Sequence, residues 1–434
     1  MPSSGVTKNV FAQLIARAVH ILCSLLLIRL IVEFLGKESY GAYGFITAII
    51  LLFGTIADWG TDIIAVREAS QNRNRHKVIF GTLLLVRLAF SLLVLLLVNL
   101  IFRFYTPWQQ FIVPATIASL VLVFLSLKGS LLAVFQTFFR LDLGAIMDGA
   151  GAVLFLFLAA LLLLYNKNVS LVMVSWVVAT GLSVCLGWIL VRNLVSLKLE
   201  WNQVVFKRLL TEALPMGTLL LVFSLYNRVD ILILQHFKGL ESVAVYDLAY
   251  KIHGNLVLGA AFLMNTLFPF LSRAYKEQNK NELKAYYHKI FGILTLGGLL
   301  VGGIFWILAK PTIFVFTGNQ YLQFIDSATA LRILVFATFF AYLNHLTGYS
   351  LIAFGKQRAS LLVAILALVF NVVANIVFIP IYSWIAAAVI TFATELFIFL
   401  ASSLIIWRTI GALPSPIWSF QTVKDLILKR GKIL

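Results

Sequence analysis

The chain has 434 residues, of which 61% are hydrophobic and only 12% are charged. Soluble domains carry about 25% charged residues, so this composition excludes a cytosolic enzyme, a secreted domain and a disordered protein. The formal net charge is +17. The basic residues nevertheless lie in short segments between long apolar runs, a pattern typical of membrane proteins rather than of nucleic-acid binding.

Twelve apolar runs are long enough to cross a bilayer as helices, which requires about 20 residues each. The sequence therefore predicts an all-α integral membrane protein. The runs start, in chain order, near Phe11, Gly41, Val78, Phe111, Gly144, Val169, Leu214, Ser242, Lys289, Ser327, Ala359 and Ser383, and the last ends near Trp407. Because this number is even, both termini are expected on one side of the membrane.

Lysine and arginine are distributed unequally between the two sets of connecting loops. One set, together with the two tails, holds most of them. The other set holds only Lys37, Arg103, Lys167, Lys238 and Lys310. Cytoplasmic loops of membrane proteins carry the excess of positive charge. We therefore expect a multi-pass protein of the cell membrane, inner or plasma, with both termini in the cytoplasm.

A short motif occurs once in each half of the chain. Gly36-Lys37-Glu38-Ser39, followed by Tyr43, is matched by Gly239-Leu240-Glu241-Ser242, followed by Tyr246, at a constant offset of 203 residues. Each copy follows the first span of its half. The repeat predicts two six-helix lobes that are related by a pseudo-twofold axis along the membrane normal.

The expected domain organisation has four parts. The N-terminal lobe covers residues 1–195, and the C-terminal lobe covers residues 214–408. Residues 196–213 form an amphipathic cytoplasmic linker between them, and residues 409–434 form a basic cytoplasmic tail. The linker and the segment Phe420–Leu434 mix apolar and basic residues. Basic amphipathic helices bind the surface of anionic leaflets, so we expect both segments at the membrane interface.

The first span carries a polar stripe. Charged residues within spans are costly and usually face a cavity or a partner. Arg17, His20 and either Cys23 or Ser24 lie on one face of a helix. The two cysteines, Cys23 and Cys185, both lie in apolar runs and are interpreted as small buried side chains rather than a disulfide or metal pair.

The seventh span, the equivalent helix of the second half, carries Asn227, Arg228 and Asp230. A cavity lined by Arg17 and Arg228 would suit an anionic substrate, because guanidinium donates paired hydrogen bonds to phosphate. The alternative is that Arg228 forms an internal ion pair with an acid on a neighbouring helix and serves packing only.

Other charged and polar residues within the spans fall into three groups. Arg29 and Arg332 are further candidates for the cavity. Glu395, Asp230 and Asp58 are candidates for binding a coupling proton or cation. Neighbouring amides, such as Asn371 and Asn375 four residues apart, are equally explained by interhelical hydrogen bonds. Four residues near span ends are interpreted as snorkelling towards the interface: Arg87, Lys128, Asp148 and Lys251.

Several ordered segments resemble the polysaccharide-biosynthesis flippases, the polysaccharide-transport branch of the multidrug/oligosaccharidyl-lipid/polysaccharide exporter superfamily. The resemblance covers most of residues 8–408, and Val245 stands where that family often has glycine. The matching segments are Phe34–Tyr43, Ala57–Gly60, Val66–Glu68, Leu214–Gly217, Asn227–Ile231, Val245–Lys251 and Phe268–Lys284.

The resemblance implies a two-lobed fold of twelve or more helices and a function in surface polysaccharide assembly, O-antigen included. Such a protein flips a polyprenyl-(pyro)phosphate-linked oligosaccharide from the inner to the outer leaflet by alternating access. By position, the substrate-binding candidates are Arg17 and Arg228, with Arg29 and Arg332 as further ones. Asn227, in the polar cluster of the seventh span, is a candidate as well. The implied partners are the lipid-linked oligosaccharide, membrane lipids, a coupling H⁺ or Na⁺, and polysaccharide polymerase machinery.

Two other functions remain open at this stage. A cation-coupled multidrug or small-molecule antiporter of the same superfamily would favour acidic residues in its cavity. A membrane scaffold, glycosyltransferase or polymerase would need large loops or a catalytic carboxylate outside the spans, whereas the loops here are short. No nucleotide-binding loop, dinucleotide fingerprint or metalloprotease motif is present in the sequence, so we expect neither an enzyme nor a bound cofactor.

Overall fold

The computed structural model describes the backbone of residues 3–411 and the side chains of residues 11–72 and 74–411. This part of the chain is helical and contains no strand. All but the first three residues of the predicted basic tail, 409–434, lie outside the described residues, as does the predicted interfacial segment Phe420–Leu434.

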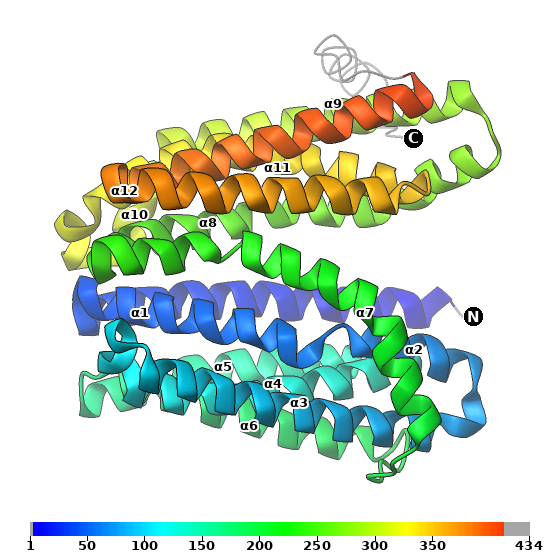
Figure 1. Ribbon diagram of the computed structural model, residues 1–434, viewed down its shortest axis with the longest axis horizontal. Helices are drawn as coiled ribbons and strands as arrows, with labels where there is room; N and C mark the ends of the chain where they lie inside the picture. The colour runs from blue at the N-terminus through cyan, green and yellow to red at the C-terminus, as the bar shows by residue number, and fades with distance from the viewer. Residues whose placement is uncertain (1–2, 412–434) are drawn as a thin grey trace. The chain divides into compact units, whose positions relative to one another are not determined.

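The helices follow one another with short connections (Figure 1). The α-helices are α1 (Ser3–Asp58), α2 (Thr61–Gln71), α3 (His76–Phe104), α4 (Ile112–Thr137), α5 (Leu141–Tyr165), α6 (Val169–Val191), α7 (Gln203–Tyr226), α8 (Val229–Lys276), α9 (Lys280–Ile307), α10 (Ala309–Thr317), α11 (Ile325–Ala353) and α12 (Gln357–Ile410). Three 3₁₀ helices lie among them: η1 (Arg73–Arg75), η2 (Thr106–Phe111) and η3 (Gly318–Phe324).

Nine helical stretches of the described chain are long and apolar enough to cross a membrane, and three of them contain a sharp break. These three have 61, 74 and 54 residues, or about 80–110 Å of helix, whereas a bilayer core is about 30 Å thick. The breaks fall at Gly36, Gly239 and Ser383. Dividing the stretches there gives twelve segments, which is the predicted number. Most begin near a predicted start, but those at Gln203, Lys280 and Ala309 begin well before the predicted Leu214, Lys289 and Ser327.

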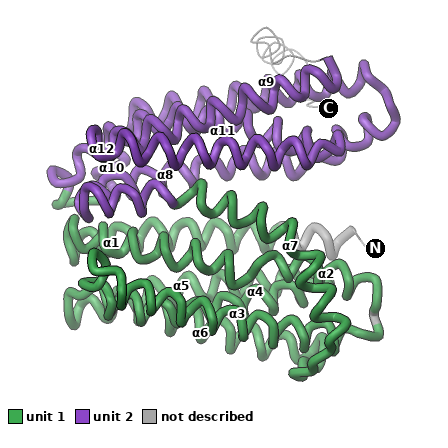
Figure 2. The backbone as a smooth tube through the Cα atoms, viewed as in Figure 1, with its two compact units in different colours: residues 1–228, 316–320 green, residues 229–315, 321–434 purple. Residues whose placement is uncertain are grey.

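The helices form two compact units, residues 1–228 with 316–320 (unit 1) and residues 229–315 with 321–434 (unit 2) (Figure 2). Within unit 1, α1 packs against α3, α4 and α5, and α6 packs against α4 and α5. Within unit 2, α11 packs against α8, α9 and α12. The division at 228/229 differs from the predicted start of a second lobe at residue 214, because α7 packs on unit 1.

The first turns of α7 explain this difference. The Asn202 side chain caps the helix by accepting hydrogen bonds from the backbone N–H groups of Val204 and Val205, each at 3.1 Å. From there Val205, Leu209 and Ala213 are buried in the core of unit 1. Their four-residue spacing puts them on one helical face. The predicted linker, 196–213, therefore includes a helical segment that is packed against the protein.

Small residues allow close helix packing in unit 2. A Cβ on Gly298 of α9 would lie 3.1 Å from Phe339 Cδ2, and one on Gly302 would lie 3.1 Å from Val335 Cγ1, both on α11. Glycines four residues apart allow helices to approach closely within membranes, and here they do so between α9 and α11.

Candidate functional site

Unit 1 holds a charged cluster within its membrane spans. Lys128 of α4 and Asp148 of α5 form an ion pair, with 2.7 Å between Nζ and Oδ1. His20 of α1 lies within electrostatic range of both and of Arg17. Arg17 is exposed, and among the side chains that the structure describes no carboxylate forms an ion pair with it. The polar stripe predicted on the first span thus lies beside a second cation and its counter-ion.

Three other candidate residues of unit 1 are described apart from this charged cluster. Arg29, also on α1, is 3.7 Å from Glu33 one turn later, and both side chains are close to half exposed. Asn227 and Arg228 occupy the break between α7 and α8, where Asn227 Nδ2 donates to the Phe223 carbonyl at 2.6 Å. Arg17, Arg29, Asn227 and Arg228 all belong to unit 1.

Arg332 belongs to unit 2 and contacts a tryptophan. Its Nε donates to the carbonyl of Trp306 at 3.2 Å, and its guanidinium lies 5.4 Å from the centre of that indole ring. A guanidinium over an aromatic face is attracted by the ring quadrupole. This contact fixes Arg332 against α9.

Arg87 is the charged residue most deeply enclosed in unit 1, with a side chain only 1% exposed. Its guanidinium lies 3.2 Å from Asp62 and 3.8 Å from Asp58, and Nε donates to Thr61 Oγ1 at 3.0 Å. The interpretation of Arg87 as a snorkelling residue is therefore wrong. Its carboxylate partners lie at the junction of α1 and α2, too far along the chain from α3 for helical spacing to reveal them.

A chain of hydrogen bonds crosses unit 2 between α8 and α12. The Tyr246 hydroxyl contacts the Asp230 carboxylate and lies 2.9 Å from Thr391 Oγ1, while the N–H of Ile231 donates to Asp230 at 2.8 Å. The Asp230 side chain is buried. A buried carboxylate surrounded by hydroxyl and amide groups can bind a proton or a small cation.

The amides of α12 continue this polar region. Asn375 Nδ2 donates to Asn371 Oδ1 at 3.0 Å, and Asn371 Nδ2 donates to Thr394 Oγ1 at 3.2 Å. The two asparagines, four residues apart, therefore lie on one face of α12. The buried Oδ1 of Asn375 has no hydrogen-bond partner, which leaves one carbonyl oxygen in this region without a donor.

Glu395 is bound by an asparagine of α11. Asn344 Nδ2 donates to Glu395 Oε2 at 2.6 Å and to its backbone carbonyl at 2.8 Å. The buried Oδ1 of Asn344 has no partner. Across the described residues no group of three His, Cys, Asp or Glu side chains could hold a metal ion.

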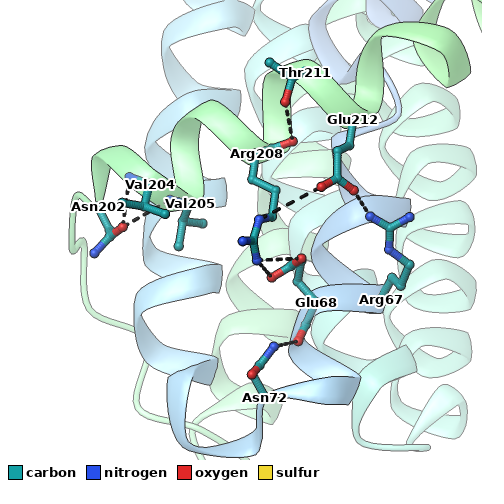
Figure 3. Close-up of polar contacts among 9 residues, drawn as sticks. All are labelled: Arg67, Glu68, Asn72, Asn202, Val204, Val205, Arg208, Thr211 and Glu212. Carbon is teal, nitrogen blue, oxygen red and sulfur yellow. Dashed lines mark hydrogen bonds and ion pairs between the residues drawn. The ribbon is translucent and has the colours of Figure 1, made fainter.

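A network of alternating charges joins α2 to the start of α7 (Figure 3). Arg208 binds both carboxylate oxygens of Glu68, at 2.9 and 3.1 Å, and approaches Glu212 at 3.9 Å. Glu212 also pairs with Arg67. Sequence reasoning did not pair these four residues, although Arg67 and Glu68 lie in a segment that carries the family resemblance.

The sequence matches the family model described as "Polysaccharide biosynthesis protein" over residues 6–275, more than half of the chain. The chain belongs to this family. A second family model, MatE, matches residues 215–377. No curated protein matches the chain.

Several solved structures share the fold of this chain. One is an inward-facing multidrug resistance MATE family transporter of the MOP superfamily, with a TM-score of 0.74 and 16% identity, covering 90% of this chain and 96% of that one. Another is the lipid II flippase MurJ in an inward closed conformation, with a TM-score of 0.72, 13% identity, and coverage of 97% and 91%.

A third is a MOP superfamily transporter from Pyrococcus furiosus, with a TM-score of 0.63, 17% identity, and coverage of 94% and 96%. That transporter is described as having a binding pocket of reverse polarity. At these identities the likeness concerns the fold. The chain thus belongs to the polysaccharide biosynthesis family and shares the fold of these solved transporters.

Two segments that carry the family resemblance contact each other in unit 1. A Cβ on Gly217 of α7 would lie 2.6 Å from Cδ1 of Trp59, and one on Gly60 would lie 3.1 Å from Cγ of Met216. The absence of side chains at both glycines lets α7 approach the junction of α1 and α2. The sequence shows both segments but not that they meet.

Proposed function

We propose that this protein flips a polyprenyl-(pyro)phosphate-linked oligosaccharide from the inner to the outer leaflet by alternating access, for surface polysaccharide assembly. The match to the polysaccharide biosynthesis family over residues 6–275 carries this proposal. The two halves of the repeat act as the two lobes. The exposed guanidinium of Arg17 within a span of unit 1 supports an anionic cargo, because such a charge needs a counter-ion or water.

The remaining basic candidates act on the same cargo. Asn227 and Arg228 lie at the break between α7 and α8. Arg29 and Arg332 supply further positive charge. An inside-negative membrane potential favours outward movement of an anion by about 2.3 kcal/mol per charge per 100 mV.

A coupling H⁺ or Na⁺ adds driving force through unit 2. Asp230 is the leading candidate because its carboxylate is buried among hydroxyl and amide groups. Glu395, held by Asn344, is the second. Asp58 is weaker, because the Arg87 guanidinium already offsets its charge at 3.8 Å.

The protein acts in the cell membrane with both termini in the cytoplasm, as the distribution of lysine and arginine favours. In this position it works beside polysaccharide polymerase machinery, which receives the flipped cargo on the outer side.

Gene disruption in the natural host tests the proposal. Loss of the protein should raise the pool of polyprenyl-linked oligosaccharide, measured by mass spectrometry, and abolish surface glycan. The wild-type gene should reverse both effects. The double variant Arg17→Ala/Arg228→Ala should not, whereas Arg192→Ala, an exposed cation at the end of α6, should behave as wild type. An unchanged lipid-linked pool in the disrupted strain would contradict the proposal.

A cation-coupled multidrug antiporter is the second candidate, favoured by the MatE match over residues 215–377. Ethidium efflux from cells that express the protein discriminates between the two functions. An antiporter would export the dye, and Glu395→Gln would abolish that export and raise drug sensitivity. Glycan assembly would then be unaffected by the disruption.

A further inference from the structure

The ion pair between Lys128 and Asp148 lies well inside the membrane spans. Asp148 is seven residues into α5 and Lys128 is nine residues before the end of α4, or about 10 and 13 Å along each helix. The two helices are joined by a tight turn, so both residues lie at a similar depth. This distance is about two helical turns from the connection between α4 and α5.

The pair remains accessible although it is intramembrane. The Lys128 side chain is 19% exposed and that of Asp148 is 39% exposed. Arg87, in the same unit, is 1% exposed and has two carboxylate partners. In the Arg87 cluster the cation is enclosed and only the carboxylates, 38% and 41% exposed, reach the surface, whereas both the ammonium and the carboxylate of the Lys128–Asp148 pair are within reach of a ligand.

Small residues keep the space around the pair open. A Cβ on Gly149 would lie 4.0 Å from Ala16 Cβ, so α1 passes close to α5 beside Asp148. A Cβ on Gly151 would lie 3.9 Å from Lys128 Nζ and 3.1 Å from Ser183 Oγ on α6. The Lys128 ammonium group therefore lies close to Gly151, between α4, α5 and α6.

Positive charge exceeds negative charge in this cluster. Arg17 on α1 and Lys128 on α4 are cations, Asp148 on α5 is the carboxylate that pairs with one of them, and His20 on α1 adds a neutral or cationic ring. From α6, the neighbouring polar group is the Ser183 hydroxyl. An unpaired guanidinium in a span is costly, and an incoming anion would reduce that cost.

We propose that Lys128 and Arg17 form a binding site for a phosphate or pyrophosphate group, and that Asp148 is its resident counter-ion, which the ligand displaces. This inference rests on the proposed function and names two residues, Lys128 and Asp148, that control binding and release of its cargo. The phosphate takes the Lys128 ammonium and the Arg17 guanidinium, and Asp148 is left without its partner. When Asp148 pairs with Lys128 again, it weakens the phosphate contact and promotes release.

The two charges are therefore expected to have opposite effects on affinity. Lys128→Gln removes a charge-assisted contact and should weaken phosphate binding about tenfold. Asp148→Asn removes the competing carboxylate and should strengthen binding while slowing turnover. A purely structural ion pair would make both variants less stable and would strengthen binding in neither.

Binding to the purified full-length protein in phosphatidylcholine nanodiscs tests this inference. The probe is radiolabelled geranylgeranyl diphosphate, with geranylgeraniol as the uncharged control. The variants are Lys128→Gln, Asp148→Asn and the exchanged pair Lys128→Asp/Asp148→Lys, which keeps an ion pair if either single variant fails to fold. Arg192→Gln is the matched control, because it removes an exposed cation outside the cluster.

Tighter binding by Asp148→Asn together with weaker binding by Lys128→Gln supports the inference. Unchanged affinity in both would overturn it. Competition by inorganic pyrophosphate would show that the anion alone is recognised. Competition by phosphatidylglycerol in place of geranylgeranyl diphosphate would overturn the assignment to the cargo and leave a membrane lipid as the ligand.

The result of this binding experiment can be distinguished from the result of the gene disruption that tests the proposed function. If gene disruption leaves the lipid-linked oligosaccharide unchanged but Lys128 and Asp148 still control probe binding, the site serves a different phosphate cargo. If the flippase function holds and neither variant changes binding, only the counter-ion role of Asp148 fails.

Discussion

Gly36 and Gly239, 203 residues apart in the sequence, have nearly identical backbone conformations. Their φ angles are 78° and 76°, and their ψ angles are −176° and −174°. Each glycine begins one copy of the repeated motif and ends the first span of its half. The repeat found in the sequence is thus matched in backbone geometry, since both copies turn the chain from one span into the next in the same way.

This conformation is essentially restricted to glycine, so Gly36→Ala and Gly239→Ala should each destabilise the protein by about 1–3 kcal/mol. Nothing lies within 4 Å of a Cβ at either position, so the loss is one of backbone strain and not of crowding. This loss of stability is measured by unfolding the protein in mixed micelles at increasing SDS concentration. Gly254→Ala is the control, because Gly254 lies within α8 in equally open space. Equal stability of all three variants would contradict the assignment.

The carboxylate partners of the enclosed Arg87 guanidinium give a second prediction. Breaking a buried ion pair by removing one partner costs about 3–5 kcal/mol. The double variant Asp58→Asn/Asp62→Asn should reach this range, because it leaves a guanidinium that is 1% exposed without a carboxylate. Arg87→Met should cost less, because the remaining carboxylates are 38% and 41% exposed and can be hydrated. The double variant and Arg87→Met are compared by their free energies of unfolding, measured in SDS titrations.

The single variants refine this comparison. Asp62 lies closer to the guanidinium than Asp58 does, at 3.2 Å against 3.8 Å. Asp62→Asn should therefore be more destabilising than Asp58→Asn. A greater loss of stability in Asp58→Asn than in Asp62→Asn would contradict the argument from distance. A greater loss in Arg87→Met than in the double variant would show that the solvent exposure of the carboxylates does not decide which partner is more costly to remove.

The contact between Trp59 and Gly217 gives a third prediction. A Cβ on Gly217 would come within 2.7 Å of three indole atoms, which requires the ring or α7 to move. Gly217→Ala should lower the midpoint of thermal unfolding in detergent and reduce complementation of a disrupted strain. Gly303→Ala, a helical glycine of α9 with nothing within 4 Å, should do neither. Normal stability and activity of Gly217→Ala would show that α7 is not held tightly at this junction.

The long apolar runs were sufficient to predict the spans, because length and hydropathy alone decide whether a helix can cross a bilayer. They could not predict that Gly36, Gly239 and Ser383 connect spans without a loop, since each connection is a local backbone turn. Nor could they pair Arg87 with Asp58 and Asp62. Helical spacing relates residues only within one helix, and these partners come from different helices.

The same limit applies to the candidate site. The stripe of Arg17 and His20 was visible because both residues belong to one helix. Lys128 and Asp148 were interpreted as separate residues near span ends, because only the packing of α1 against α4 and α5 brings them to that stripe. The sequence did not predict that α7 associates with unit 1. This association depends on the cap at Asn202 and on buried residues of the linker, whose basic residues had suggested a helix at the membrane interface.

The charge network of Figure 3 yields the last prediction. The side chains of Arg208, Arg67 and Glu212 are 40–50% exposed, whereas Glu68 is 15% exposed. Exposed ion pairs contribute about 0–1 kcal/mol and are screened by salt, but the Glu68 carboxylate that Arg208 Nη1 contacts at 2.9 and 3.1 Å is largely shielded from solvent, which strengthens the pair. A double-mutant cycle of Arg208→Gln and Glu68→Gln should thus give a larger coupling energy than one of Arg67→Gln and Glu212→Gln.

Salt concentration provides the check on this last comparison. The Arg67–Glu212 coupling should fall when NaCl is raised from 50 mM to 1 M, since the Debye length shortens to about 3 Å at 1 M. The Arg208–Glu68 coupling should fall less, because the Glu68 carboxylate is largely shielded from solvent. If both couplings vanish together at high salt, the network is a surface feature. If the Arg208–Glu68 coupling persists, that pair helps to hold the start of α7 on α2, and charge reversal at Arg208 should release it.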